Sequence, residues 1–253
     1  MESTVHLVRT SFPERPAFDT AVSRAILERV AAGELPETIR LARPGAMVAF
    51  GKQDRSSSGY GEAVRAARDQ GFEAVERLAG GRAAVFHEQT VALAWARRDP
   101  DPWPGTHDRF REIAGIIERA LASLGVDARI GEIPGEYCPG EYSLNARGEK
   151  KLVGLGQRIV KGASHIGGVI VVGQSARLVD VLVPVYAALK LGWKPDTTGS
   201  LEDELGPIEW DDVADALLRE WSGGAELTEV GLDAETLALA ERLEPDHLSR
   251  RAG

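Results

Sequence analysis

Residues 136–158 read EYCPGEYSLNARGEKKLVGLGQR, and this stretch contains the clearest β-hairpin of the chain and its single cysteine. Residues 142–145 and 150–154 form the two predicted strands, with the turn at Ala146-Arg147-Gly148. Cys138 stands just before the hairpin on a Pro-Gly loop, and Lys150 and Lys151 open its second strand. The stretch therefore predicts antiparallel pairing and places a thiol one hairpin away from two lysines.

Further strands are predicted on both sides of this hairpin. Short segments rich in β-forming residues precede it at 38–42, 47–50, 74–78, 83–86 and 91–96, and a strand pair at 156–160 and 166–172 follows it.

Helices are predicted where apolar residues recur at helical spacing. Residues 18–30 form the first, followed by Gly33, and residues 107–124 form the second, followed by Gly125. The pattern becomes helical again after residue 180, although Pro184 is expected to begin or interrupt a helix rather than lie inside it. Residues 210–221 and 233–243 are predicted as two helices with polar faces.

These elements predict an α+β fold with mixed, largely antiparallel sheets flanked by helices. We expect a catalytic domain over residues 1–190 and a helical C-terminal tail, residues 191–253, packed on it.

Composition excludes several kinds of partner. The chain has 30 basic and 39 acidic residues and a net charge of -9, which argues against a nucleic-acid backbone. No apolar stretch is long enough to cross a bilayer, and residues 1–9 lack the regions of a signal peptide, so a cytoplasmic protein without a membrane partner is expected. No Cys and His cluster has metal-ligand spacing, so we expect no metal site.

A paired glycine within residues 77–88 is the first candidate for a binding site. Gly80 and Gly81 allow the backbone to approach a ligand closely, and Arg77 and Arg82 beside them suit a phosphate or carboxylate. A glycine turn with solvated arginines is an equally good interpretation of this composition.

Cys138 is the second candidate. A nearby positive charge favours the thiolate, which is the nucleophilic form of cysteine. A lone cysteine is, however, more often an inert packing residue, here beside a surface lysine pair. Spacing alone does not decide between these two interpretations.

The order of several short motifs, from about residue 18 to residue 172, resembles the lipoate-protein ligase and octanoyltransferase family. The motifs are Pro36-Glu37-Thr38-Ile39-Arg40-Leu41, Val48-Ala49-Phe50-Gly51-Lys52-Gln53, Gly80-Gly81-Arg82-Ala83, and Lys151-Leu152-Val153-Gly154 with Gln157-Arg158. The resemblance implies the fold of the biotin/lipoate protein ligase catalytic domain. Cys-Pro-Gly followed by tyrosine, and the later Lys-Lys and Gln-Arg pairs, look most similar to the cysteine-dependent octanoyl amidotransferases.

Carried over by position, the resemblance makes Cys138 the nucleophile that holds the acyl group and Lys151 the residue that binds its carbonyl. It implies substrate-binding roles for Arg77, Gly80, Gly81, Arg82, Ala83, His87, Gly154 and Gln157. The implied partners are lipoyl-domain proteins, namely the glycine cleavage H protein and oxo-acid dehydrogenase subunits, and the cargo is an octanoyl or lipoyl group. Arg82 and His87 look more like the branch that uses acyl carrier protein, or the ATP-dependent ligases, and Ala79 stands where several branches have a hydroxyl residue.

Acyl transfer through Cys138 requires no cofactor. One alternative is an ATP-dependent ligase that uses ATP and Mg, forms an acyl-adenylate and needs Lys151 but not Cys138. Another is a non-catalytic relative that binds an acyl group or biotin, and biotin attachment is a third.

The sequence also suggests walls and flanking groups for the site. Val85 and Val91 are expected to line an acyl tunnel, while His87 is either a general base or a structural histidine. His165 is expected to be a turn residue. Replacing Lys151 with alanine is expected to depress transfer and to leave the fold intact, because a surface lysine contributes little to stability.

Overall fold

The hairpin beside the cysteine forms part of a large mixed sheet. In the computed structural model, which describes residues 4–221 and 226–249, β8 (Leu144–Ala146) pairs with β9 (Lys150–Val160), and β9 pairs with β10 (Ala163–Val171). The strand β9 is continuous, so the prediction of separate strands at 150–154 and 156–160 is wrong. Gly154 and Gly156 do not break it because both pair directly with residues of β10.

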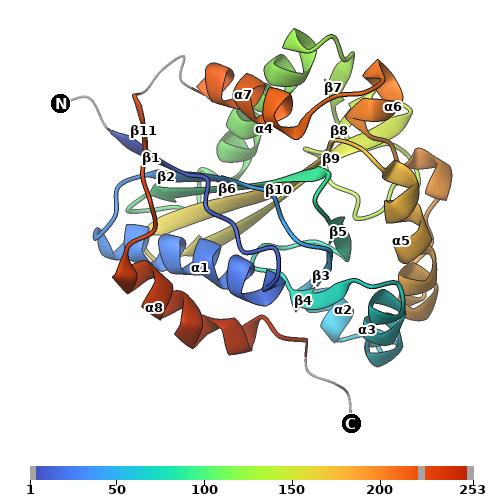
Figure 1. Cartoon of the computed structure of the whole chain (residues 1–253), viewed down its shortest axis with the longest axis horizontal. Helices are drawn as coiled ribbons and strands as arrows, with labels where there is room; N and C mark the ends of the chain where they lie inside the picture. The colour runs from blue at the N-terminus through green and yellow to red at the C-terminus, as the bar shows by residue number, and fades with distance from the viewer. Residues whose placement is uncertain (1–3, 222–225, 250–253) are drawn as a thin grey trace.

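Eight strands make up this sheet within the described residues (Figure 1). Beyond β10 lie β6 (Thr90–Arg98), β2 (Thr38–Ala42), β1 (Val5–Val8) and β11 (Leu227–Glu229), and β7 (Ala128–Ile130) forms the opposite edge. Only the pairs β11–β1 and β1–β2 are parallel. The predicted mixed, largely antiparallel architecture is confirmed.

A smaller sheet of three strands lies beside the large one. Its central strand β3 (Met47–Phe50) pairs with β4 (Glu73–Glu76) in parallel and with β5 (Ala84–Phe86) in antiparallel orientation. The short helix α2 (Lys52–Arg55), then α3 (Tyr60–Asp69) and α5 (Ser175–Leu189) accompany it. An apolar cluster joins this sheet to α3 and α5.

Helices cover both faces of the large sheet, as Figure 1 shows. On one face, α1 (Pro16–Ala32) packs with α8 (Ala234–Leu243), and on the other α4 (Thr106–Ser123) packs with α7 (Trp210–Trp221). Gly33 ends α1 with φ of 77°, a left-handed conformation that glycine adopts without strain. Short helical turns at α6 (Leu201–Leu205), η1 (Pro195–Thr197) and η2 (Glu244–Asp246) complete the described elements.

Pro184 lies inside α5, which contradicts the prediction that it would begin or interrupt a helix. The helix buries one face, comprising Leu178, Val181, Leu182, Val185, Tyr186 and Leu189. Asp180, whose carbonyl loses its helical partner, is exposed, so water can replace the missing bond. Burial of the apolar face therefore outweighs the local preference of proline.

The helices predicted at 210–221 and 233–243 are present as α7 and α8. Two tryptophans of α7, Trp210 and Trp221, belong to the same buried cluster as Trp95 of β6. The boundary near residue 190 stays a prediction. In the part of the chain that the structure describes, no helix is long and apolar enough to span a membrane.

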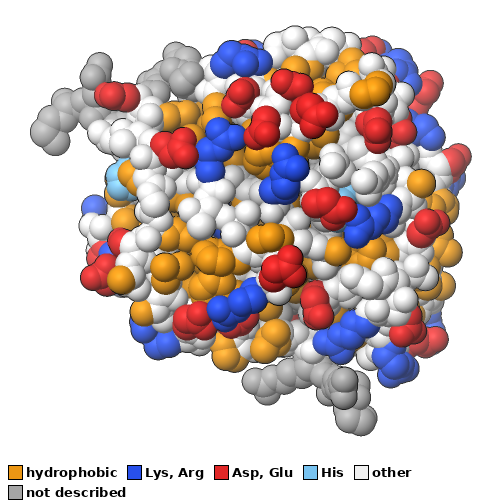
Figure 2. All heavy atoms as spheres, viewed as in Figure 1, with side chains coloured by type: hydrophobic (Ala, Val, Ile, Leu, Met, Phe, Trp, Pro, Cys, Tyr) orange, Lys and Arg blue, Asp and Glu red, His pale blue; other side chains and the backbone are white. Residues whose placement is uncertain are grey.

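Charges of both signs are interspersed on the face shown in Figure 2. A nucleic-acid backbone favours a continuous basic patch, and this face presents none.

Candidate active site

Cys138 lies on the loop between β7 and β8 in a left-handed conformation with φ of 42°. For a residue other than glycine this conformation is strained and persists only where the surroundings hold it. The backbone N–H of Cys138 donates to Tyr186 Oη at 2.9 Å, and its carbonyl accepts from Lys151 Nζ at 2.8 Å. The peptide groups on both sides of the thiol are therefore fixed.

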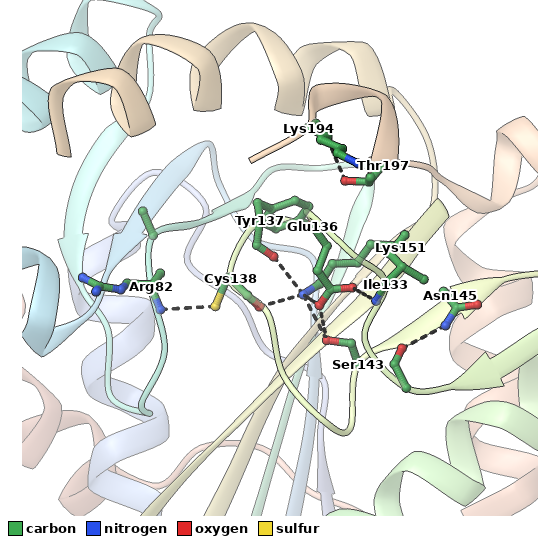
Figure 3. A network of polar contacts seen from close by, with 12 residues as sticks. Arg82, Ile133, Glu136, Tyr137, Cys138, Ser143, Asn145, Lys151, Lys194 and Thr197 are labelled. Atoms are coloured by element: carbon green, nitrogen blue, oxygen red, sulfur yellow. Dashed lines mark hydrogen bonds and ion pairs between the residues drawn. The ribbon is translucent and has the colours of Figure 1, made fainter. Parts of the chain in front are cut away.

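Lys151 is the centre of this network (Figure 3). Its Nζ lies within 3.0 Å of four oxygens, those of the Glu136 carboxylate, the Tyr137 and Cys138 carbonyls and the Ser143 hydroxyl. The side chain is fully buried, so the expectation of a surface lysine is wrong. A buried ammonium is tolerated because every hydrogen has an acceptor.

Glu136 supplies the negative charge that balances this ammonium. One oxygen accepts from Lys151 Nζ at 2.7 Å and from the Ser143 hydroxyl at 2.8 Å, and the other accepts from the Ile133 N–H at 3.1 Å. Sequence reasoning missed both Glu136 and Ser143. Each lies close to Cys138 in sequence, but only the folded loop shows that both turn inward toward Lys151.

The loop between β4 and β5, residues 77–83, provides hydrogen-bond donors to the thiol. We call it the glycine loop. The Arg82 N–H lies 3.2 Å from Cys138 Sγ, and Arg77 Nη1 lies 3.8 Å from it. Gly81 has φ of 117°, and a β-carbon at this position would stand only 3.0 Å from the sulfur. The absence of a side chain there is what permits the close approach.

Asp54 holds the same loop through an ion pair with Arg82. Its buried carboxylate accepts from the Gly51 N–H at 2.9 Å and from Arg82 Nη1 at 3.3 Å. Burial raises the pKa of Asp54 above its usual value, while these hydrogen bonds and the charge of Arg82 act in the opposite direction. The Arg82 side chain is thus held away from the thiol while its backbone N–H faces it.

A cavity of about 90 Å³ opens beside the sulfur and runs between the two sheets. Cys138, Arg77 and Lys151 lie along it together with apolar residues of five strands, among them Met47, Ala49, Phe86, Ala92, Leu155 and Val169. Gly154 also lines it, as the resemblance implies. We call this cavity the slot. Its apolar walls suit a hydrocarbon chain.

Val85 and Val91 do not line the slot, so that prediction is wrong. Both are buried in other clusters, and their neighbours Phe86 and Ala92 line the slot instead. Side chains alternate between the faces of a strand, so an error of one residue selects the opposite face.

Polar groups also line the slot. Arg40 and Asp19 form a buried ion pair, with Arg40 Nη2 and Asp19 Oδ1 2.5 Å apart. His165 lines the same cavity from within β10, so it is not the expected turn residue. Burial, and secondarily the charge of Arg77, lowers the pKa of His165 to about 4, and its Nδ1 has no hydrogen-bond partner among the described residues.

Two predicted site residues outside the glycine loop, His87 and Gln157, are not among those that line the slot. His87 is fully buried, its Nδ1 accepts the Gln89 N–H at 3.1 Å, and burial lowers its pKa to about 4. Gln157 of β9 pairs directly with Ile166 of β10, and the side chain of Ile166 packs on the α4 and α7 side of the sheet. Paired residues share a face, so Gln157 lies on that side as well. The roles predicted for both stay predictions.

The other glycine-loop residues, Gly80, Gly81, Arg82 and Ala83, do not line the slot either. Gly80 and Gly81 are exposed, whereas Ala83 is buried and its carbonyl accepts from Tyr186. Among the described residues, no group of three or more His, Cys, Asp or Glu side chains could hold a metal ion.

Comparison with known proteins places this geometry in context. Residues 15–222 match the lipoyl protein ligase A/B catalytic domain. The chain is 27% identical over 234 residues to the octanoyl-GcvH:protein N-octanoyltransferase of Geobacillus kaustophilus, covering 86% of this chain and 82% of the relative. It is 28% identical to the enzyme of the same name from an Exiguobacterium species, covering 78% and 74%.

Solved structures show the same fold. A lipoate-protein ligase A bound with ATP superimposes with a TM-score of 0.78 at 22% identity, covering 97% of this chain and 95% of that one. The bipartite lipoate protein ligase of Thermoplasma acidophilum gives a TM-score of 0.74 at 20% identity, covering 96% and 92%. Because the family match spans most of the sequence, the chain belongs to the lipoyl protein ligase A/B catalytic domain family.

Proposed function

We propose that this chain is an acyltransferase that attaches octanoyl or lipoyl groups to a lysine of lipoyl-domain proteins through a thioester on Cys138. The observation that carries the proposal is the position of Cys138 Sγ, which lies along an apolar slot and within 3.2 Å of the Arg82 N–H. The relatives named as octanoyl-GcvH:protein N-octanoyltransferases support the choice of octanoate and of a lipoyl-domain acceptor.

In the first step, the Cys138 thiolate attacks the acyl carbonyl of the donor. A carbon–sulfur bond forms, the bond to the donor group breaks, and the donor group leaves with the proton that the thiol gave up. The apolar chain occupies the slot, where each buried methylene contributes about 0.8 kcal/mol.

In the second step, the amine of an acceptor lysine attacks the thioester. An amide bond forms, the carbon–sulfur bond breaks, and the proton lost by the amine returns to the sulfur. Two protein partners can therefore bind in turn, since the acyl group stays on the enzyme between the two visits.

Donors around the sulfur stabilise the charge that develops on the acyl oxygen in both steps. The Arg82 N–H and the Arg77 guanidinium lie closest to Sγ, at 3.2 Å and 3.8 Å. Lys151 adds the positive charge of an ammonium bonded to the carbonyl of Cys138 itself. Preorganised donors of this kind typically contribute about 3 kcal/mol each to transition-state stabilisation.

The ATP-dependent ligase is the alternative, and it would use ATP and Mg to form an acyl-adenylate without the thiol. Every hydrogen of the Lys151 ammonium already has an acceptor within the protein, so a phosphate or acyl oxygen could reach it only by displacing one of them. The transferase requires neither ATP nor a metal, and acyl carrier protein is an alternative donor to the H protein.

Intact-mass measurement separates these possibilities. Octanoylated H protein is expected to add one octanoyl mass to the parent protein, and Cys138→Ala is expected to abolish the addition. Octanoyl carrier protein tests the other donor in parallel. Release of pyrophosphate on addition of lipoate and ATP, with no covalent adduct on the protein, or undiminished transfer by Cys138→Ala, would exclude the thioester route.

A further inference from the structure

The position of the thiol depends on contacts between two loops that come from different sheets. Cys138 lies on the loop before β8 of the large sheet, and Arg82 lies on the loop before β5 of the small sheet. The contact between Cys138 Sγ and the Arg82 N–H, at 3.2 Å, therefore spans the junction between the sheets. Some group must hold the loops in register, because neither belongs to a regular element.

Tyr186 of α5 connects these loops through one oxygen atom. Its hydroxyl accepts the N–H of Cys138 at 2.9 Å and donates to the carbonyl of Ala83 at 3.0 Å. Ala83 directly follows Arg82 in the chain, so each bond ends within one residue of the sulfur contact. The side chain is only 2% exposed, so water does not compete for either bond.

The hydroxyl also counteracts strain at Cys138. The left-handed conformation of this residue directs its N–H toward Tyr186 and its carbonyl toward Lys151. Because burial raises the pKa of Tyr186 well above its usual value, the hydroxyl keeps its proton and continues to donate to Ala83.

We propose that the Tyr186 hydroxyl is a positioning group for the reactive thiol, which ties the Cys138 loop to the glycine loop and keeps Sγ within reach of the Arg82 N–H. The hydroxyl acts through Cys138 and Ala83. The consequence for acyl transfer rests on the proposed function, whereas the consequence for the thiol itself does not.

The variant Tyr186→Phe tests this inference because it removes the hydroxyl and keeps the ring. The ring packs in the apolar cluster of the small sheet and lies 5.4 Å from the Trp193 ring, contacts that phenylalanine preserves. The chain has one cysteine, so alkylation by iodoacetamide at fixed pH reports on Cys138 alone. We expect its rate to fall about tenfold, because the thiolate loses the well-placed Arg82 N–H.

Acyl transfer provides a second readout. For Tyr186→Phe we expect kcat to fall about tenfold while KM for the octanoyl donor stays unchanged, because no residue of the slot is altered. General loosening of the fold would instead weaken donor binding and raise KM.

Tyr60→Phe is the matched control. Its hydroxyl donates to Ser249 Oγ at 2.8 Å, and its ring packs against the same cluster as Tyr186, away from the slot. We expect Tyr60→Phe to alkylate and to transfer at the parental rates, and thermal melting should show that both variants fold.

Parental alkylation and transfer rates in folded Tyr186→Phe would overturn the inference, as would an equal loss in Tyr60→Phe. Failure of the parent protein to acylate would instead refute the proposed function. In that case the alkylation rates alone still decide the role of Tyr186.

Discussion

Lys151 Nζ lies 2.8 Å from the carbonyl oxygen of Cys138, so the ammonium and the thiol meet on the same residue. The ammonium also bonds the Tyr137 carbonyl at 3.0 Å and the Glu136 carboxylate at 2.7 Å. One buried charge therefore holds three consecutive residues of the loop. Its structural and catalytic contributions can be separated by the variants that follow.

Lys151→Met is expected to lower the free energy of unfolding by about 3–5 kcal/mol, because it leaves the buried Glu136 carboxylate without its charge partner. Urea denaturation measures this loss. This predicted loss of stability replaces the expectation of an intact fold, which assumed that Lys151 lies at the surface.

The double variant Lys151→Met/Glu136→Gln provides the control for charge. Removing the second charge is expected to restore part of the lost stability while transfer stays depressed. If the double variant is as unstable as the sum of the two single variants, the ion pair is not the cause.

Gly81→Ala is expected to lower acylation of Cys138 at least tenfold. The new β-carbon would stand 3.0 Å from Sγ and 2.8 Å from Arg77 Nη1, so the donors must move away from the sulfur. Gly71→Ala is the control, since Gly71 also has positive φ, at 79°, but has no atom within 4 Å of the added carbon. Stopped-flow acylation should show a loss at Gly81 only; similar losses in both variants would point to backbone strain.

Ala94→Leu is expected to shift the acyl preference toward shorter chains. Ala94 of β6 pairs with Gly167 of β10, and both residues line the slot. A larger side chain at Ala94 therefore takes up space that the end of an acyl chain would fill. Each methylene kept out of the slot removes about 0.8 kcal/mol of binding, roughly a fourfold loss. Competition between octanoyl and butanoyl donors measures the shift, and an unchanged ratio would show that the chain does not reach this point.

His165 is expected to make the fold sensitive to acid. Burial lowers its pKa from 6.5 to about 4, so the unfolded chain binds more protons than the folded protein between these values. The stabilisation is fully present above pH 6.5 and is lost as the pH falls toward 4. Urea midpoints across this window should decline less steeply for His165→Gln than for the parent, and parallel declines would contradict the assignment.

Much of the fold was predictable because its signals are local. The strand β2 and the helix α1 follow directly from β-forming composition and from apolar spacing with a terminal glycine. The continuity of β9 and the passage of α5 through Pro184 were not predictable, because strand pairing and helix burial supply the deciding energy.

The site shows the same division. Cys138, Arg77, Lys151 and Gly154 carry motifs that can be recognised in the sequence, and all four lie along the slot. Glu136 belongs to no such motif, since its partner stands fifteen residues away and only the folded loop brings the charges together. Its importance follows from burial, which residue identity does not reveal.

The packing of Gly51 against Gly81 couples the slot to the loop that faces the thiol. A β-carbon on Gly51 would fall 1.8 Å from the Gly81 carbonyl oxygen, so the end of β3 rests directly against the loop that faces the thiol. Met47 and Ala49 of that same strand line the slot. An acyl chain too wide for the slot would displace β3 and, through Gly51, the loop that carries the Arg82 N–H. Such a chain would weaken the hydrogen bond to Cys138 Sγ before the thiol reacts.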